Sequence, residues 1–279
     1  MSGLNVSLGY FLAVTAFGAS VRALFSRWPR LNFVLEFASS FMLVACWLEV
    51  QTIVDIGQWA GGLGPDVTLT ILFVMLLTHG IVCGGATGNP SLVLMRFLLL
   101  ESSTLPTVLA VAAHFLGAHL GLRVAVYYWN LELTDMHMIK NLMSRECSPA
   151  LKVSLLQGVF TEGVSALIFY IIYLFLNRRS AFLRVPVVAL TLTFLFHVAS
   201  EYTSAFLNPS LAYGLTFSCP GFTFMEYSVV YWLGPILGMA LGLVLYMGHI
   251  PRIFARNLFY SQKTRYRVPK GDQGEKKKK

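Results

Sequence analysis

The tetrapeptide Asn-Pro-Ser-Leu occurs twice, at Asn89–Leu92 and Asn208–Leu211, each time after a long apolar segment. Asparagine is a preferred helix N-cap and proline suits the first helical position, so each copy predicts the start of a short helix. A helix that begins inside a membrane presents unpaired N–H groups and the positive end of its dipole. Together with an asparagine carboxamide, which donates hydrogen bonds, this arrangement can hold the oxygen of a polar solute.

The motif residues that we expect to act together are Asn89, Pro90, Ser91, Asn208, Pro209 and Ser210. Each asparagine would cap its helix and point its amide into a lumen. Two such donors at one constriction orient a passing water molecule, so that it does not easily relay a proton, and two positive helix ends repel cations. A single copy would more often start a turn, but a mirrored pair favours a pore.

Two acidic residues, Glu36 and Glu162, lie within apolar segments, where a carboxylate facing lipid would be costly. We expect each of them to accept hydrogen bonds from backbone N–H groups of the loops that carry the motifs, because buried donors need partners. The alternative role is a proton relay. Both glutamates precede a motif at a similar distance along the chain.

The composition is that of a polytopic membrane protein: 279 residues, 56% hydrophobic and 12% charged, with a mean hydropathy of +0.66. The net charge of +8 comes from Lys and Arg in short loops and in the tail. This is the positive-inside pattern of a chain in contact with membrane lipid, and it argues against nucleic-acid binding. The sequence shows no nucleophile–base pair, metal-ligand spacing or phosphate loop, so we expect no enzyme activity, no cofactor and no metal.

Seven apolar spans are predicted, since about 20 residues cross a bilayer: Leu4–Phe25, Phe33–Ile53, Val67–Cys83, Leu105–Trp129, Leu151–Leu176, Val185–Ser200 and Phe224–Met247. The segments Asn89–Leu100 and Asn208–Ser218 are too short to cross. Arginines place one set of loops in the cytosol, whereas Glu49, Asp55, Asp66 and the loop Asn130–Pro149 fall on the other side.

The chain divides into three parts: residues 1–30 as an N-terminal hydrophobic helix, 31–250 as a channel domain and 251–279 as a basic cytoplasmic tail. Within the channel domain, residues 31–129 and 151–250 each contain three spans and one half-helix. Three is an odd number, so the second repeat must be inverted, and inverted repeats place their working site at the midplane. The first helix could span the membrane, lie in the interface or act as a signal. If it spans, the sequon at Asn5 faces the glycosylation machinery.

These residues resemble the aquaporin (major intrinsic protein) family, whose paired Asn-Pro-Ala motifs also follow helices bearing a glutamate. Shorter segments resemble its unorthodox intracellular branch, among them Leu4–Leu8, Thr203–Pro209, Tyr231–Pro235 and Asn257–Tyr260. The resemblance implies an all-α membrane fold with six transmembrane helices and two re-entrant half-helices, to which the N-terminal helix is an addition. It also implies a homotetramer with one pore per subunit, passing water and small neutral solutes. Ser91 and Ser210 replace the family's usual alanine.

The resemblance also locates a selectivity filter, at Leu69, Phe196, Ala205 and Leu211. If the correspondence slips by one residue, His197 forms the fourth wall. Water-selective members carry arginine where this chain has Leu211. An apolar filter offers few donors to replace lost hydration. Strict water selectivity is therefore in doubt, and glycerol-like solutes or hydrogen peroxide become candidates.

Cysteines and lysines outside the pore suggest two further features. Cys147 and Cys219 both fall on the lumenal side, where thiols oxidise, so either a disulfide or two free thiols fit the sequence. Lys276 and Lys277 stand fourth and third from the end of this sequence, which resembles a dilysine retrieval signal for the endoplasmic reticulum. A basic tail that binds anionic lipid is the alternative.

The sequence therefore favours a passive multi-pass channel for water and small neutral solutes in an intracellular membrane, most simply the endoplasmic reticulum. Two other functions stay open. One is a broken-helix secondary transporter, which needs ion-coupling ligands near the midplane. The other is a non-conducting or weakly conducting membrane scaffold.

Overall fold

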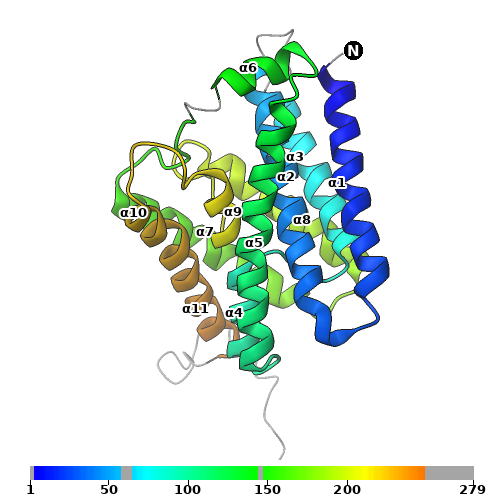
Figure 1. Ribbon diagram of the computed structural model, residues 1–279. Helices are drawn as coiled ribbons and strands as arrows, with labels where there is room; N and C mark the ends of the chain where they lie inside the picture. The colour runs from blue at the N-terminus through cyan, green and yellow to red at the C-terminus, as the bar shows by residue number, and fades with distance from the viewer. Residues whose placement is uncertain (1–2, 58–64, 144–146, 249–279) are drawn as a thin grey trace, which may run out of the picture.

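In the computed structural model, residues 3–57, 65–143 and 147–248 are described, and they form helices joined by loops (Figure 1). The first half comprises α1 (Gly3–Phe25), a 3-10 turn (Pro29–Leu31), α2 (Asn32–Gly57), α3 (Pro65–Cys83), α4 (Pro90–Leu98) and α5 (Thr104–Trp129). The second half comprises α6 (Asp135–Met143), α7 (Leu155–Leu176), α8 (Ala181–Ala199), α9 (Pro209–Leu215), α10 (Phe224–Ser228), a π-helical segment (Val229–Leu233) and α11 (Gly234–Tyr246).

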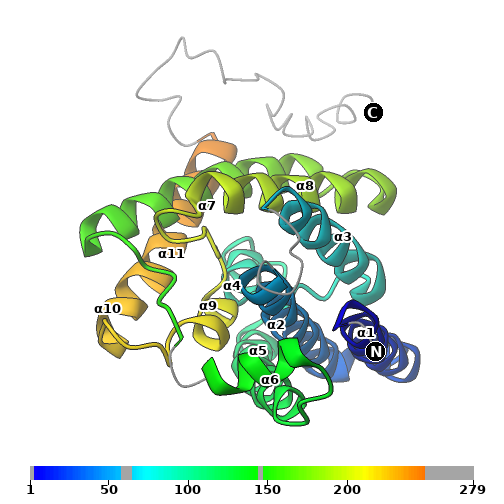
Figure 2. The ribbon, with the colours of Figure 1, turned by 90° about the horizontal axis from the view of Figure 1, so that it is seen from above.

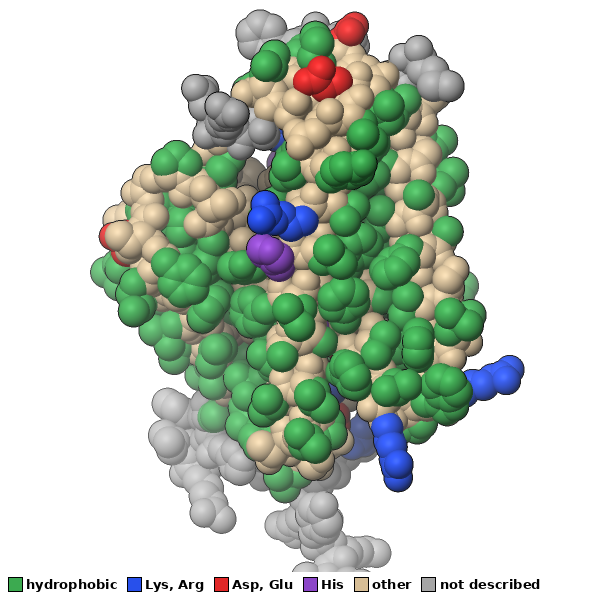
Figure 3. All heavy atoms as spheres, viewed as in Figure 1, with side chains coloured by type: hydrophobic (Ala, Val, Ile, Leu, Met, Phe, Trp, Pro, Cys, Tyr) green, Lys and Arg blue, Asp and Glu red, His purple; other side chains and the backbone are tan. Residues whose placement is uncertain are grey.

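Among the described residues, six helical segments are long and apolar enough to cross a membrane: Gly3–Phe25, Pro29–Ile56, Thr104–Trp129, Leu155–Leu176, Ala181–Ala199 and Phe224–Tyr246. The apolar part of α3, Val67–Cys83, is shorter than the other spans. Hydrophobic side chains predominate over the middle of the face in Figure 3, where basic and histidine side chains interrupt them, and acidic ones lie at the end that carries α6. These segments coincide with the seven apolar spans expected from the sequence.

Each half of the molecule is built around one tightly packed helix pair. In the first half α5 lies against α2 at Gly117, where an added Cβ would come within 2.3 Å of the Phe37 carbonyl oxygen. In the second half α11 lies against α7 at Gly238, where an added Cβ would come within 2.2 Å of the Gly163 carbonyl oxygen. Small residues let helix backbones approach in this way inside a membrane. The two pairs occupy corresponding positions, as an inverted repeat requires.

The two Asn-Pro motifs each begin a short helix, α4 and α9, and neither is long enough to cross the bilayer. Figure 1 shows α9 toward the end that carries α6 and α4 toward the opposite end, and the two helices contact each other. Proline occupies the first position of both helices, where its missing N–H leaves no bond unmade. The motifs therefore meet between the two halves of the chain.

The N-terminal helix α1 lies at the edge of the bundle beside α2 and α3 (Figure 2). A buried polar cluster holds it there. Ser7 of α1 donates a hydrogen bond to Glu49 of α2, Trp129 Nε1 donates to the same carboxylate at 3.1 Å, and His137 Nε2 lies 2.9 Å from it. Glu49, placed near a lumenal loop by the sequence analysis, is therefore fully buried.

The loop between α5 and α7 contains α6, a helix that the sequence analysis did not predict. His137 on α6 is completely buried, and its Nδ1 lies 2.7 Å from the Thr134 hydroxyl. Contact with the Glu49 cluster thus fixes α6 over the ends of α2 and α5. The tail at 251–279, with Lys276 and Lys277, lies outside the described residues.

Candidate functional site

Asn89 and Asn208 lie together at the junction of α4 and α9, and each bonds to the loop of the other motif. Asn89 Nδ2 donates to the carbonyl of Leu207 at 3.1 Å. Asn208 Nδ2 donates to the carbonyl of Gly88 at 2.9 Å. Both side chains are almost fully buried. This reciprocal pair of bonds locks the two loops tip to tip.

The same carboxamides cap the two half-helices through their oxygens. Asn89 Oδ1 accepts from the Ser91 backbone N–H at 2.9 Å. Asn208 Oδ1 accepts from the N–H of Ser210 at 3.1 Å and from the N–H of Leu211 at 3.3 Å. An amide group carries two N–H donors, so each asparagine keeps one donor beyond its bond to the opposite loop.

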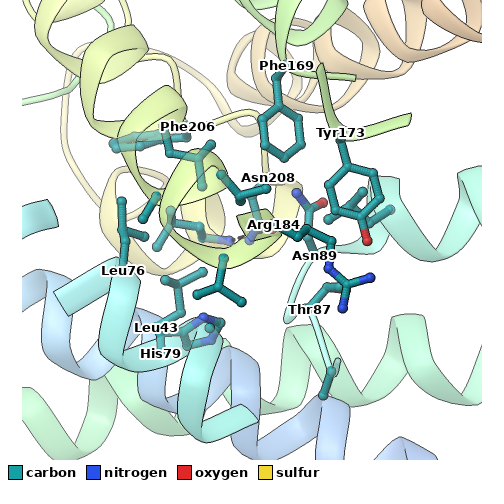
Figure 4. A pocket seen from close by; sticks show the side chains of 18 of the residues that line it. Leu43, Leu76, His79, Thr87, Asn89, Phe169, Tyr173, Arg184, Phe206 and Asn208 are labelled. Atoms are coloured by element: carbon teal, nitrogen blue, oxygen red, sulfur yellow. Dashed lines mark hydrogen bonds between the residues drawn. The ribbon is translucent and has the colours of Figure 1, made fainter. Parts of the chain in front are cut away.

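Both asparagines line a cavity of about 140 Å³. Figure 4 shows them between Phe169 and Tyr173 of α7 on one side and Leu43 and His79 on the other. The remaining walls come from α2, α3, α4, α8, α9 and the two motif loops. The lining includes Trp47, Leu76, Thr87, Leu92, Arg96, Arg184, Val188, Ala205, Phe206 and Leu211.

Glu36 of α2 supports the loop that precedes Asn89. Its Oε2 accepts from the backbone N–H groups of Thr87 at 2.8 Å and Gly88 at 3.1 Å. His114 Nε2 lies 2.9 Å from the same oxygen, and an Arg96 guanidinium nitrogen lies 3.9 Å from Oε1. The carboxylate is 1% exposed, so its partners replace the water that it has lost.

Glu162 of α7 supports the loop that precedes Asn208. Its two oxygens accept from the backbone N–H groups of Phe206 at 3.1 Å and Leu207 at 3.0 Å. The Tyr231 hydroxyl holds the same loop by donating to the Thr203 carbonyl at 3.1 Å. Both intramembrane glutamates therefore accept backbone bonds at equivalent places, and neither is among the residues that line the cavity.

The residues assigned to a filter from the sequence are not all brought together by this cavity. Ala205 and Leu211 line it, whereas Leu69, Phe196 and His197 do not. Phe196 packs edge-on against Trp47, with ring centroids 5.5 Å apart, and His197 is exposed. Trp47 and Phe206 line the cavity near Leu211, and the sequence analysis did not single them out.

Cys147 and Cys219 form a disulfide that joins the loop before α7 to the segment after α9. Nearby, the Ala150 N–H donates to the Thr216 hydroxyl at 3.0 Å, so the same two segments are also joined by a hydrogen bond. Of the two options that the sequence left open, the structure contains the bridge. It ties the chain down close to the end of the second half-helix.

Ser210 and Ser91 differ in their bonding. The Ser210 hydroxyl donates toward Asn208 Oδ1 at 2.9 Å and toward the Gly88 carbonyl at 3.1 Å. The Ser91 hydroxyl makes no corresponding bond to its own cap. Thus only the second motif uses its serine to reinforce the junction between the loops.

Several residues of the site carry no sequence signal of their own. His114 and Arg96 join Glu36, and Arg184 reaches the cavity from α8, although all three stand in ordinary apolar or loop contexts. These contacts cannot be predicted from the local sequence, because the residues lie far from their partners along the chain. Spacing identifies the motif residues, but it cannot identify the side chains that the fold brings to them.

Curated proteins similar to this chain share most of its length. It is 42% identical to mouse "Aquaporin-12" (Mus musculus), covering 97% of this chain and 95% of that protein. It is 40% identical to human "Putative aquaporin-12A" (Homo sapiens), covering 97% and 89%. It is 31% identical to human "Aquaporin-11", covering 78% and 79%.

Other comparisons agree at the level of fold. A solved structure of the aquaglyceroporin from Plasmodium falciparum matches with a TM-score of 0.60, covering 80% of this chain and 98% of that one. At 15% identity this match concerns the fold alone. No family model matches the chain.

Proposed function

This chain belongs to the aquaporin family, and we propose that it is a passive channel for water and small neutral solutes, with glycerol and hydrogen peroxide as candidates. The observation that carries the proposal is the junction of the half-helices. Asn89 and Asn208 lock each other's loops and still line one cavity. Each retains an N–H that can donate to a passing oxygen.

The proposed filter is apolar. Leu211 and Ala205 line the cavity together with Trp47 and Phe206, and we propose Leu69 and Phe196, or His197 in the shifted register, as its outer walls. Such a constriction gives a hydrated ion almost nothing in exchange for its water shell. It favours small neutral molecules whose dehydration costs less.

An ion-coupled carrier is a weaker proposal. Coupling needs ligands that a translocated ion can reach near the midplane. Glu36 and Glu162 are instead occupied by the N–H groups of the motif loops and stand outside the cavity lining. A non-conducting scaffold is the second alternative, and an absence of water and solute flux would favour it.

We also propose the cellular setting and the assembly. Lys276 and Lys277 support retrieval to the endoplasmic reticulum, and the family supports a homotetramer with one pore per subunit. The channel domain is residues 31–250, with residues 1–30 as an additional membrane helix and 251–279 as a cytoplasmic tail.

Stopped-flow swelling of proteoliposomes tests the proposal. Wild-type protein is expected to raise permeability to water, and the flux should increase linearly with the gradient rather than saturate. Replacing Leu211 with Arg should lower glycerol flux relative to water flux, whereas Leu211→Met, which keeps an apolar side chain of similar volume, should not. Wild-type liposomes no more permeable than protein-free ones would refute the channel. Unchanged solute ratios in Leu211→Arg would refute the filter assignment alone.

A further inference from the structure

The charged side chains that line the cavity are all cationic. Among its lining residues, all within the described part of the chain, are Arg96 and Arg184, and none is an aspartate or glutamate. The lining also includes Trp47, Phe206 and Leu211, which carry no charge. The cavity therefore has cationic side chains from the last turn of α4 and the first turn of α8 among mostly uncharged walls.

Arg96 is committed to structural partners. One guanidinium nitrogen lies 3.9 Å from Glu36, and another donates to the Gly85 carbonyl at 3.3 Å. Its positive charge is thus largely balanced by the buried carboxylate that supports the first loop.

Arg184 has no such partner. Within residues 3–57, 65–143 and 147–248, the structure contains no ion pair and no side-chain hydrogen bond for this guanidinium. It lies in the first turn of α8, where the helix dipole disfavours a positive charge. Helix stability therefore does not explain an arginine at this position.

The packing of α8 on α3 fixes the backbone that carries Arg184. The next residue, Val185, fills the space beside Gly80 of α3, where an added Cβ would come within 2.6 Å of Val185 Cγ1. Val188, one turn further along α8, also lines the cavity. Consequently this face of α8 cannot turn away from the cavity without breaking a close helix contact.

We propose that Arg184 is the charge filter of this channel: it repels cations at the mouth on the α4 side and lets neutral solutes reach the asparagine pair. The inference rests on the proposed function. It adds a barrier that depends on the sign of the charge to the dehydration barrier of the apolar constriction that includes Leu211. A charge beside a narrow cavity with mostly apolar walls acts over a lower effective dielectric than bulk water, so one unbalanced arginine raises the energy of a cation there.

The plain alternative is that Arg184 is one more cytosolic charge that orients the chain in the membrane. Arg178 and Arg179, in the turn before α8, serve as an internal comparison because they are exposed and do not line the cavity. If these arginines only orient the chain, removing any one of them should have the same effect. If Arg184 is the charge filter, only its removal should weaken the exclusion of cations.

The first experiment measures the electric field in the cavity directly. A cysteine is introduced by Val188→Cys and modified with methanethiosulfonates that carry a negative, a positive or no charge. With Arg184 present, the anionic reagent should react faster than the cationic one. Arg184→Gln should lower that rate ratio about tenfold, whereas Arg184→Lys and Arg179→Gln should preserve it. Protein without the new cysteine controls for labelling of Cys46 and Cys83.

The second experiment measures ion leak through the same variants in planar bilayers, with gel-filtration profiles as the check on folding. Arg184→Gln should raise the cation leak above that of the wild type, Arg184→Glu should raise it further, and Arg184→Lys and Arg179→Gln should leave it at the wild-type value. An unchanged reagent ratio together with an unchanged leak in Arg184→Gln would overturn the charge filter and leave the water channel intact.

The two proposals fail in distinguishable ways. If wild-type liposomes conduct no water but the reagent ratio still depends on Arg184, the channel is refuted and the cationic field of Arg184 in the cavity is supported. If not even the neutral reagent labels the cysteine at 188, the cavity is closed to solutes and both proposals are overturned.

Discussion

The two motif loops are held by glutamates with very different surroundings. Glu36 accepts two backbone N–H bonds and also meets His114 at 2.9 Å and Arg96 at 3.9 Å. Glu162 accepts two backbone N–H bonds, and the described part of the chain gives it no ion pair. The inverted repeat preserves the backbone contacts of the carboxylate, but not the charges around it.

A second contrast concerns what ties each loop to the rest of the chain. The first loop is tied ionically, because Arg96 bridges Glu36 and the Gly85 carbonyl. The second is tied covalently, since Cys219 follows α9 and pairs with Cys147. An ionic tie suits a reducing cytosol and a disulfide suits an oxidising lumen. The two tethers therefore fit opposite sides of a membrane, one facing a reducing compartment and the other an oxidising one.

The largest expected difference is between Glu36→Gln and Glu162→Gln. The first leaves His114 and Arg96 without their anion and should cost about 3–5 kcal/mol, as for a broken buried ion pair. The second weakens hydrogen bonds to Glu162 but leaves no cation without its anion, so it should cost about 1–3 kcal/mol. Thermal unfolding in detergent ranks the two variants under identical conditions.

Equal losses in these two variants, or a greater loss in Glu162→Gln, would show that the charges around Glu36 do not stabilise the first loop. His114→Gln provides an independent check, because it should destabilise the protein only while Glu36 is present.

The covalent tether is expected to contribute next. It closes a loop across 72 residues, and Cys219→Ser should cost about 4 kcal/mol in the chain-entropy model of disulfides. Cys147→Ser should have the same effect, and the double variant should lose no more than either single one. A reducing agent should lower the wild-type unfolding temperature and leave all three variants unaffected.

A wild-type unfolding temperature insensitive to reductant would count against the covalent tether. Additive losses of stability in the double variant would also count against it, because either single substitution already removes the whole disulfide.

The smallest difference is between the two serines. Ser210→Ala removes bonds to Asn208 and to the Gly88 carbonyl, and it should cost about 0.5–1.5 kcal/mol. Ser91→Ala removes no bond to its own cap and should cost less. Unfolding curves of the two variants, recorded side by side, decide the order. If Ser91→Ala proves the more damaging, the bonding pattern assigned to the second motif is wrong.

Much of the fold could be predicted because apolar length and helix capping are local properties. The spans, the two half-helix starts at Asn89 and Asn208, and the membership in the aquaporin family follow from segments readable one at a time. The roles of Glu36 and Glu162 followed from a general cost, since a carboxylate inside a membrane must find donors.

The remainder depends on contacts between distant segments. Nothing local distinguishes Glu49 from a lumenal surface residue, yet α1 and α6 close over it. Helix α6 is only nine residues long, too short to be stable by propensity alone, so its existence depends on buried contacts such as that of His137. Arg184 reads as a cytosolic charge until the packing of α8 on α3 turns it toward the cavity.

Both halves meet at one lumen, and blocking it is the most direct test of the account. Val188→Trp on α8 places a bulky side chain in the cavity lining, and Val198→Trp places the same side chain on the exposed face of the same helix, where valine is 57% exposed. Stopped-flow water permeability should fall to that of protein-free liposomes in Val188→Trp and stay at the wild-type value in Val198→Trp. Equal permeability in the two folded variants would contradict a pore between Asn89 and Asn208.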